Sequence, residues 1–468
     1  MGCIVDCTTG LGCLLFNCST CFCCIRSYVE DKSIGNPSIL GSYQKDQAPF
    51  AHSELPAIAL IAKSVEEISA TLKFAYEKRI PVVTRGAGSG LAGGANAIAN
   101  SIVISTEKLT RILEIDPINQ IARVEAGVIN KDLDNAVAEY GLAYYPDPAS
   151  REWSTIGGNI ATNAGGMCCV KYGVTSQHVR SIKVVLADGD VVDFGFPTKK
   201  AVTTLDLMRL FVGSEGSLGV IVEATVSIPP RQKSPVTLVA LFSDIEHATD
   251  AAQEMLSLRP SMLELMDKTT LQAVESWKSL GFSECGALLI MQSDSDPSDC
   301  ALARDIALNN HAIEAEFSDD PRDSDDLIHV RKLAYPALER MGVALLDDVV
   351  VPISQISHLV TGVRKIASEH DLVIGIFGHA GDGNMHPTIV YPHNDPASEK
   401  RAMAAFSEII ALAQSLGGTA SGEHGIGNLK VNQSSNEISP RIMDLQRAIK
   451  SLLDPHGILN PGKKFPIS

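Results

Sequence analysis

The sequence has no excess of basic residues, no internal repeat and no low-complexity run after residue 30. Lysine and arginine total 39 against 55 aspartate and glutamate residues, which gives a net charge of −16. A surface that neutralises many phosphates needs the opposite balance, so this composition argues against nucleic acid as a partner. Hydrophobic residues make up 45% of the chain, which excludes disorder as the main state. Its length of 468 residues predicts two to three domains.

Cysteine is almost absent from the body of the chain. Seven of the 11 cysteines lie in the first 24 residues, and only Cys168, Cys169, Cys285 and Cys300 occupy the other 444 positions. This usage argues against a disulfide framework and suits a reducing compartment. We therefore expect a cytoplasmic protein, with peripheral association with a membrane as the alternative.

Residues 1–44 form a cysteine-rich extension that we expect to lie outside the fold. It has no basic residue before Arg26, as a secretory signal would need, and Asp6 stands where a myristoylation pattern has Ser or Thr. The apolar part is also too short and too polar for a transmembrane helix. An acylated membrane tether and a metal site at Cys18-x-x-Cys21 are the alternatives.

Strand and helix signals alternate from about residue 51, which predicts an α+β fold. Alternating apolar residues on both sides of Asp188-Gly189 predict a hairpin. Pro229-Pro230 is the strongest internal boundary, so we expect one domain at 45–228, a second at 229–438 and a terminal segment at 439–468.

Periodicity and capping residues predict several helices. One is expected to be capped by Asn130 and to stop at Gly141. Three longer helices are predicted at 325–340, 397–416 and 440–453.

Three glycine-rich segments follow one another along the first domain. They read Arg85-Gly-Ala-Gly-Ser-Gly-Leu-Ala-Gly-Gly94, Ser154-Thr-Ile-Gly-Gly-Asn-Ile-Ala-Thr-Asn-Ala-Gly-Gly166 and Gly213-Ser-Glu-Gly-Ser-Leu-Gly219. Residues without a Cβ let backbone N–H groups approach a pyrophosphate. The first segment matches the Rossmann fingerprint, but only seven residues separate Gly94 from the strand at Ile102, too few for a crossover helix. The three segments instead predict loops that envelop one long ligand.

The order and spacing of these segments resemble the vanillyl-alcohol oxidase/p-cresol methylhydroxylase superfamily. Within it, the branch with the flavin subunit of glycolate oxidase, FAD-linked D-lactate dehydrogenase and D-2-hydroxyglutarate dehydrogenase is the most similar. The resemblance runs from about residue 45 to the C-terminus. It implies a two-subdomain FAD-binding domain at 45–228, an α+β substrate-cap domain with the metal and catalytic motifs at 229–438, and a terminal segment that returns to the FAD domain at 439–468.

The resemblance also implies that the first segment holds the FAD pyrophosphate and that the other two line the ribityl chain and the isoalloxazine ring. No histidine lies in or near these segments, the nearest being His52 and His178, so we expect noncovalent FAD. The residues expected to contact FAD are Arg85, Gly86, Ala87, Gly88, Ser89, Gly90, Gly93, Gly94, Pro148, Ser154, Thr155, Gly157, Gly158, Asn159, Thr162, Asn163, Gly165, Gly166, Glu215, Gly219, Val220, Ile221 and Asn460.

Two short motifs in the second domain, at 378–387 and 421–427, concentrate histidine and acidic residues. Two histidines and a carboxylate suit a divalent transition metal, and from the residues alone ordinary hydrogen-bonded histidines are the alternative. The spacing fits no common hydrolase motif. The resemblance implies that His379, His386 and Glu423 bind a divalent metal, such as Zn, Mn or Fe, beside the flavin.

The resemblance assigns roles to further residues. His424 is the implied general base, which takes the hydroxyl proton while hydride leaves C2 for the flavin. Arg331 is implied to bind the substrate carboxylate, for which a forked guanidinium is suited, although Ile328 replaces the usual tryptophan and a solvated helix-face cation is the alternative. Asn384 is expected to be a donor behind the ligands or beside the flavin, or equally a turn residue.

We therefore predict FAD-dependent oxidation of a D-2-hydroxy acid, D-lactate or glycolate first, to the 2-oxo acid. The alternatives are a D-2-hydroxyglutarate dehydrogenase, a flavin-binding subunit of a multi-subunit glycolate oxidase, and a metallohydrolase, which would leave the three glycine segments without a role. The electron acceptor (quinone, cytochrome, flavoprotein or oxygen) is not predicted, and a homodimer and partner subunits are both open.

Overall fold

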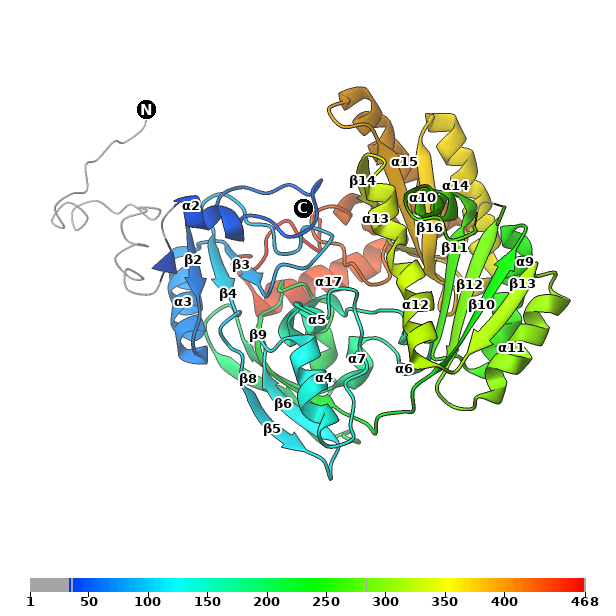
Figure 1. The fold of residues 1–468 in the computed structure, drawn as a ribbon. Coiled ribbons are helices and arrows are strands. Elements are labelled where there is room, and N and C mark those ends of the chain that lie inside the picture. Colours follow the sequence, from blue (N-terminus) through cyan, green and yellow to red (C-terminus); the bar gives the residue numbers. More distant parts are fainter. Residues whose placement is uncertain (1–32, 35–36, 283, 467–468) are drawn as a thin grey trace.

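The computed structural model describes residues 33–34, 37–282 and 284–466, so the predictions for residues 1–32 lie outside the described residues. The described end of the expected extension belongs to the fold instead, because Ser33 and Ile34 pair with a strand and Leu40 and Tyr43 are buried. Sheets and helices are mixed throughout, which confirms the predicted α+β fold class. Two lobes lie next to each other, the N-terminal lobe in blue to teal and the other in green to orange (Figure 1). No helix among the described residues is long and apolar enough to span a bilayer.

The N-terminal lobe contains two sheets, with strand orders β1-β2-β4-β3 and β5-β6-β9-β7-β8. Neighbouring strands β2, β4 and β3 are parallel, whereas the second sheet is antiparallel. The strands are β1 (Ser33–Ile34), β2 (Ile58–Ile61), β3 (Val82–Arg85), β4 (Ile102–Ser105), β5 (Ile112–Asp116), β6 (Ile121–Glu125), β7 (Val179–Val185), β8 (Val191–Gly195) and β9 (Val220–Ser227).

Short loops and helices surround these sheets. The chain between β3 and β4 contains no helix, in line with the short spacing after Gly94, and the first glycine segment leaves the carboxyl end of β3. The β7–β8 pairing confirms the hairpin at Asp188-Gly189, where Gly189 has φ +89°. The helices of this lobe are α2 (Pro37–Leu40), α3 (Val65–Lys78), α4 (Asn130–Ala138), α5 (Ile156–Thr162), α6 (Cys169–Tyr172), α7 (Thr175–His178) and α8 (Met208–Phe211).

One predicted helix start is wrong by one residue. Ile129, with extended backbone, occupies the N-cap of α4, and Asn130 is the first helical residue. The buried Asn130 side chain donates instead to the carbonyl of Pro146. This contact ties α4 to the segment that precedes the second glycine segment.

The second lobe is built on one large antiparallel sheet of order β13-β10-β12-β11-β16-β17-β14, with β15 paired to β17. Its strands are β10 (Val236–Phe242), β11 (Met262–Asp267), β12 (Ala287–Ser293), β13 (Glu314–Ser318), β14 (Val343–Leu346), β15 (Val349–Val350), β16 (Val373–His379) and β17 (Asn384–Tyr391).

Helices cover both faces of this sheet, because successive side chains of each strand point to opposite faces. Leu263 and Ile376 face the helices α9, α11, α14 and α15, whereas Phe377 faces the other side and packs with Leu271 and Leu338 of α10 and α13. The helices of the second lobe are α9 (Ile245–Met255), α10 (Lys268–Trp277), α11 (Ser298–Asn309), α12 (Pro321–Lys332), α13 (Ala334–Glu339), α14 (Ile356–His370), α15 (Pro396–Ser415) and α16 (Val431–Ser434). They are followed in the chain by α17 (Pro440–Leu453), which packs on the N-terminal lobe.

The single helix predicted at 325–340 is wrong. The structure has two helices, α12 and α13, which meet at Leu333. Pro336 has no N–H to donate to the carbonyl of Lys332, and its ring crowds that carbonyl, so a continuous helix is broken there.

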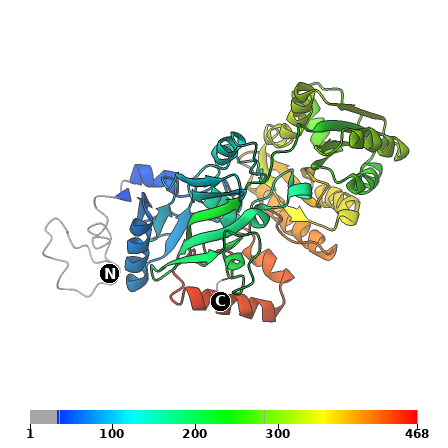
Figure 2. The same ribbon diagram turned by 90° about the horizontal axis from the view of Figure 1, so that it is seen from below.

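The chain returns to the N-terminal lobe at its C-terminal end, where α17, in red, lies along the lower edge of that lobe in Figure 2 and packs Ile449 and Leu453 against its core. Leu459 bridges Val82 of β3, and Asn460 donates its backbone N–H to the Val82 carbonyl at 2.8 Å. The Lys463 ammonium is 2% exposed and donates to the carbonyls of Gly94, at 3.1 Å, and of Asn96. The terminal segment therefore supports the first glycine segment from behind.

The buried Lys463 predicts a pH dependence of stability. Burial lowers the pKa of Lys463 to about 7, whereas an unfolded lysine has a pKa of about 10.4. Between about pH 7 and about pH 10.4 the unfolded chain binds more protons at Lys463 than the folded chain does. The free energy of unfolding therefore rises as pH rises above 7, and this gain is lost as pH falls to 7 again. From pH 7 to pH 9 the free energy of unfolding of wild type should gain roughly 2 kcal/mol relative to Lys463→Met. Parallel pH curves for the two proteins in urea titrations would contradict this.

Candidate active site

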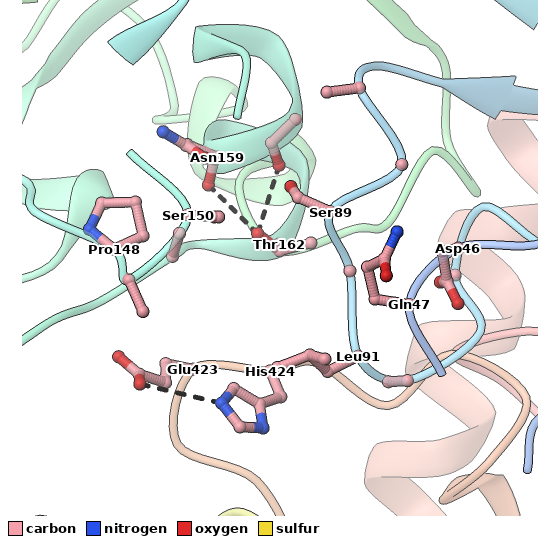
Figure 3. A pocket seen from close by; sticks show the side chains of 18 of the residues that line it. Asp46, Gln47, Ser89, Leu91, Pro148, Ser150, Asn159, Thr162, Glu423 and His424 are labelled. Atoms are coloured by element: carbon pink, nitrogen blue, oxygen red, sulfur yellow. Dashed lines mark hydrogen bonds and ion pairs between the residues drawn. The ribbon is translucent and has the colours of Figure 1, made fainter. Parts of the chain in front are cut away.

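One cavity of about 940 Å³ joins the glycine segments to the histidine motifs. This volume is at the upper end of the range for small-molecule and cofactor sites. Gly88, Gly158 and Gly219 line one part of it, and His379 and His424 line another. Figure 3 shows Ser89 and Thr162 on one side of the opening and Glu423 with His424 on the other.

Most residues predicted to contact FAD line this cavity. They are Gly86, Ala87, Gly88, Ser89, Gly90, Gly94, Pro148, Thr155, Gly157, Gly158, Asn159, Thr162, Gly165, Gly166, Glu215, Gly219 and Ile221. Six others are not among its lining residues, namely Arg85, Gly93, Ser154, Asn163, Val220 and Asn460. Several of these six support the lining from behind: Arg85 donates to the Lys45 carbonyl at 3.0 Å, and Asn460 donates to the carbonyls of Gly94 and Glu215.

The backbone around the cavity leaves no room for side chains where the glycines stand. A Cβ at Gly86 would lie 2.4 Å from Thr155 Oγ1, and a Cβ at Gly166 would lie 2.3 Å from the Asp147 carbonyl. Small residues therefore let three loops approach one another and keep their backbone next to the cavity. This fits a long ligand with a pyrophosphate, as FAD has.

The sheet register brings the two predicted histidine ligands together. His386 of β17 is paired with Phe377 of β16, and His379 lies two residues after Phe377, so the three side chains share one face. His379 and His386 are 5% and 4% exposed, and their Nε2 atoms are 3.4 Å apart.

Glu423 completes the group from a separate loop. Its Oε1 lies 3.4 Å from His379 Nε2 and 3.5 Å from His386 Nε2. Two ligands of a tetrahedral zinc, each about 2.1 Å from the metal, are separated by about 3.4 Å. The three predicted metal ligands thus form a donor set of the right size for a transition metal, and His424 Nε2 lies 3.9 Å from the same glutamate oxygen.

The electrostatics of His386 and Glu423 suit a cation, whereas His379, with a raised pKa, must release its proton for a metal to bind. Burial, with the charges of His379 and His424, lowers the pKa of His386 to about 3, so this imidazole is neutral. Burial raises the pKa of Glu423. The hydrogen bond with His379 and the positive charge of His379 outweigh burial and bring the pKa of Glu423 to about 2. Neutral imidazole and ionised carboxylate are the forms that bind a metal.

His379 is held from behind by an acid that the sequence reasoning missed. Glu264 of β11 is fully buried, and its Oε1 lies 2.5 Å from His379 Nδ1. Burial would lower the pKa of His379, but Glu264 and Glu423 outweigh burial and raise it well above its usual range. A lone acid in the apolar run Met262-Leu-Glu-Leu-Met266 was the available signal, because a buried carboxylate needs a partner.

Arg331 is the second partner of Glu264. Its Nε donates to Glu264 Oε2 at 2.6 Å, and its guanidinium carbon lies 4.6 Å from the centre of the Phe377 ring. The side chain is 10% exposed and Arg331 lines the cavity, so it is not a solvated cation on a helix face. Arg331 lies beside the predicted metal ligands, and its Nε is already bonded to Glu264. Its binding of a substrate carboxylate remains a prediction.

Asn384 is bonded away from the cavity. Its Nδ2 donates to Asp348 Oδ1 at 2.7 Å and to the Val349 carbonyl at 3.1 Å, and it is not among the lining residues of the cavity. Asn384 therefore lies behind His386, as a donor to the acid beside that histidine, and its catalytic role remains a prediction. Asp348, another buried acid missed from sequence, is fully enclosed next to the loop that carries Glu423.

Comparison with known families matches both lobes. Residues 56–195 match the FAD binding domain, and residues 231–464 match the C-terminal domain of FAD linked oxidases. The chain belongs to the FAD-linked oxidase family. It is therefore a flavoprotein oxidoreductase.

Named relatives cover nearly the whole chain. It is 36% identical over 431 residues to the glycolate oxidase subunit GlcD of Bacillus subtilis, covering 90% of this chain and 92% of that protein. It is 39% identical over 404 residues to a D-lactate dehydrogenase of Archaeoglobus fulgidus, covering 85% and 89%.

Solved structures agree on the fold. A p-cresol methylhydroxylase with substrate bound superposes with a TM-score of 0.75 at 18% identity, over 94% of this chain and 95% of that chain. An alkyldihydroxyacetonephosphate synthase gives 0.71 at 17% identity, over 93% and 84%. These likenesses show the fold and confirm the predicted p-cresol methylhydroxylase type of architecture.

Gly88→Val should lose most of the bound flavin. Gly88 has φ +77°, which valine rarely adopts, and a Cβ there would lie 2.1 Å from the Arg85 guanidinium. The substitution would therefore deform the first glycine segment itself, as well as fill its surface. Flavin per protein, measured on acid-released FAD, should fall several-fold, whereas the control Gly281→Val, at an open site with φ +90°, should keep its flavin. Full flavin content in Gly88→Val would be the contrary result.

Proposed function

We propose that this protein oxidises a D-2-hydroxy acid to the 2-oxo acid with noncovalently bound FAD, and that D-lactate or glycolate is its substrate. The observation that carries the proposal is the single cavity that the glycine segments share with His379, His386, Glu423 and His424. The names of the relatives, a glycolate oxidase subunit and a D-lactate dehydrogenase, support this substrate class.

Each group has a proposed role. FAD held by the three glycine segments would supply a two-electron hydride acceptor, and a divalent cation held by His379, His386 and Glu423 would supply a Lewis acid that lowers the pKa of the substrate hydroxyl. His424, beside Glu423 at the edge of the same cavity, takes the hydroxyl proton. Arg331, with its Nε fixed by Glu264, orients the substrate carboxylate with its remaining nitrogens.

Two alternatives differ from this proposal, one in how electrons leave the flavin and one in the substrate. Relatives named as glycolate oxidase subunits support partner subunits for this chain, in which case electrons leave through another protein. A D-2-hydroxyglutarate dehydrogenase would need a place for a second carboxylate. The same site is compatible with a homodimer. It is also compatible with quinone, cytochrome, flavoprotein or oxygen as the electron acceptor.

An anaerobic flavin-bleaching screen tests the proposed function. The purified flavoprotein is mixed with glycolate, D-lactate, L-lactate and D-2-hydroxyglutarate, and the flavin absorbance is followed. D-lactate or glycolate should bleach the flavin with the highest ratio of rate to half-saturating concentration, because relatives that cover most of the chain are named for these two acids. Bleaching by D-2-hydroxyglutarate alone would establish the dehydrogenase alternative, and bleaching by none of the four would refute the proposal.

Removing a ligand and removing the base should give different defects. His386→Ala should weaken both substrate binding and flavin reduction, and excess divalent metal should restore part of the rate. His424→Ala should keep metal and flavin but reduce the flavin roughly 10²–10⁴-fold more slowly, the usual contribution of a general base, and metal should not help it. The measurement is the flavin-reduction rate with and without added Zn²⁺ or Mn²⁺. If His424→Ala reduces its flavin at the wild-type rate, His424 is not the base.

A further inference from the structure

We propose that Asp348 is a positioning residue that sets the orientation of His386 and of the loop that carries Glu423 and His424. The inference rests on the proposed function, because it concerns the geometry of the same metal-ligand group. Asp348 lies directly before β15, is fully buried, and is not among the residues that line the cavity. It acts on the site through other residues.

One carboxylate oxygen holds the whole loop. Asp348 Oδ2 accepts the backbone N–H groups of Gly422, Glu423 and His424 at 3.0, 3.1 and 2.9 Å, and the Ser421 hydroxyl at 2.8 Å. Three consecutive N–H groups that converge on one oxygen fix the local backbone. This backbone determines where the side chains of Glu423 and His424 point.

The other oxygen reaches the strand that carries His386. Asp348 Oδ1 accepts from Asn384 Nδ2 at 2.7 Å, two residues before His386, and lies 3.8 Å from His386 Nδ1. That ring nitrogen is buried and has no hydrogen-bond partner among the described residues. An imidazole that binds a metal through Nε2 carries its proton on Nδ1 and usually donates it to a carboxylate.

The two histidines are thus matched by two buried carboxylates. Glu264 already contacts His379 Nδ1 at 2.5 Å, and Asp348 is the corresponding group for His386. Each of the two histidines therefore has a buried acid at its Nδ1, on the side away from Glu423. This shared arrangement assigns Asp348 to the site.

A buried ion pair supports Asp348. Lys430, 2% exposed, donates to the carbonyls of Asp348 and Ala420 at 2.9 and 2.7 Å, and pairs with Asp347 Oδ1 at 2.7 Å. This ammonium ties the β14–β15 connection to the start of the loop that holds Glu423. It keeps the backbone of Asp348 fixed relative to the N–H groups that its side chain binds.

Asp348→Asn tests the proposal because an amide cannot replace this carboxylate. Both oxygens accept from N–H donors, so either orientation of the amide places its NH₂ group against a donor. The variant should keep its FAD, but its Zn²⁺ dissociation constant, from equilibrium dialysis with metal counted by mass spectrometry, should rise roughly 10–100-fold. At saturating Zn²⁺ its flavin reduction by D-lactate or glycolate should stay roughly tenfold or more below wild type, because His424 is also misplaced.

Asp267→Asn is the matched control. Asp267 is 1% exposed on the same sheet and also accepts backbone N–H groups, from Thr270 and Ile376, but contacts neither the loop nor the histidines. It should lose thermal stability while its Zn²⁺ dissociation constant stays within a factor of about three. Equal increases in the dissociation constant for both variants would mean that Asp348 acts only through general stability, which would overturn the proposal.

Ser421→Ala is a milder variant for the case that Asp348→Asn does not fold. It removes one donor to Asp348 Oδ2 without burying a new polar group. A smaller shift in Zn²⁺ affinity and in flavin-reduction rate in the same direction supports the proposal, and wild-type values for both contradict it. If wild type itself binds no Zn²⁺, the metal part of the proposed function fails instead, and the reduction rates of the variants still decide whether Asp348 places His424.

Discussion

A carboxylate that is buried must be surrounded by donors or cations, and this constraint organises the centre of the molecule. Glu264 is matched by Arg331 and His379, and Glu423 by His379 and a second histidine. Asp348 is matched by a row of backbone N–H groups. Each acid thereby draws together segments that are far apart in the sequence, so the charges around the candidate metal site also hold these segments in one arrangement.

The same principle joins the two lobes across the cavity. Glu215, in the third glycine segment, accepts the backbone N–H groups of Ile426 and Gly427 at 2.8 and 2.6 Å. Lys463, from the terminal segment, donates to the first glycine segment. The third glycine segment and the loop with Glu423, which line the same cavity, are therefore fixed to each other by buried polar contacts.

Sequence reasoning predicted the α+β class, the family, most of the cavity lining and the convergence of His379, His386 and Glu423, because these depend on local patterns and on a resemblance with ordered motifs. It did not predict Glu264 or Asp348. The partners of Glu264 lie 67 and 115 residues away, and the N–H groups that Asp348 accepts from the Glu423 loop lie 74 to 76 residues away. A single acid in an apolar strand shows that a partner exists but not which one. The break in the helix at 325–340 depended on Pro336, a local signal that the helical periodicity outweighed.

The site divides its chemistry between a rigid and an adjustable part. His379 and His386 stand on paired strands in the middle of a large sheet, where the register fixes the distance between their rings. Glu423 and His424 stand on a loop without regular structure, where only hydrogen bonds from the side can fix the backbone. A metal needs ligands at set distances, whereas a base must follow the substrate. The proposed ligand Glu423 and the proposed base His424 are neighbours on one loop, and the contacts of Asp348 fix the backbone of both residues while His424 still lines the cavity.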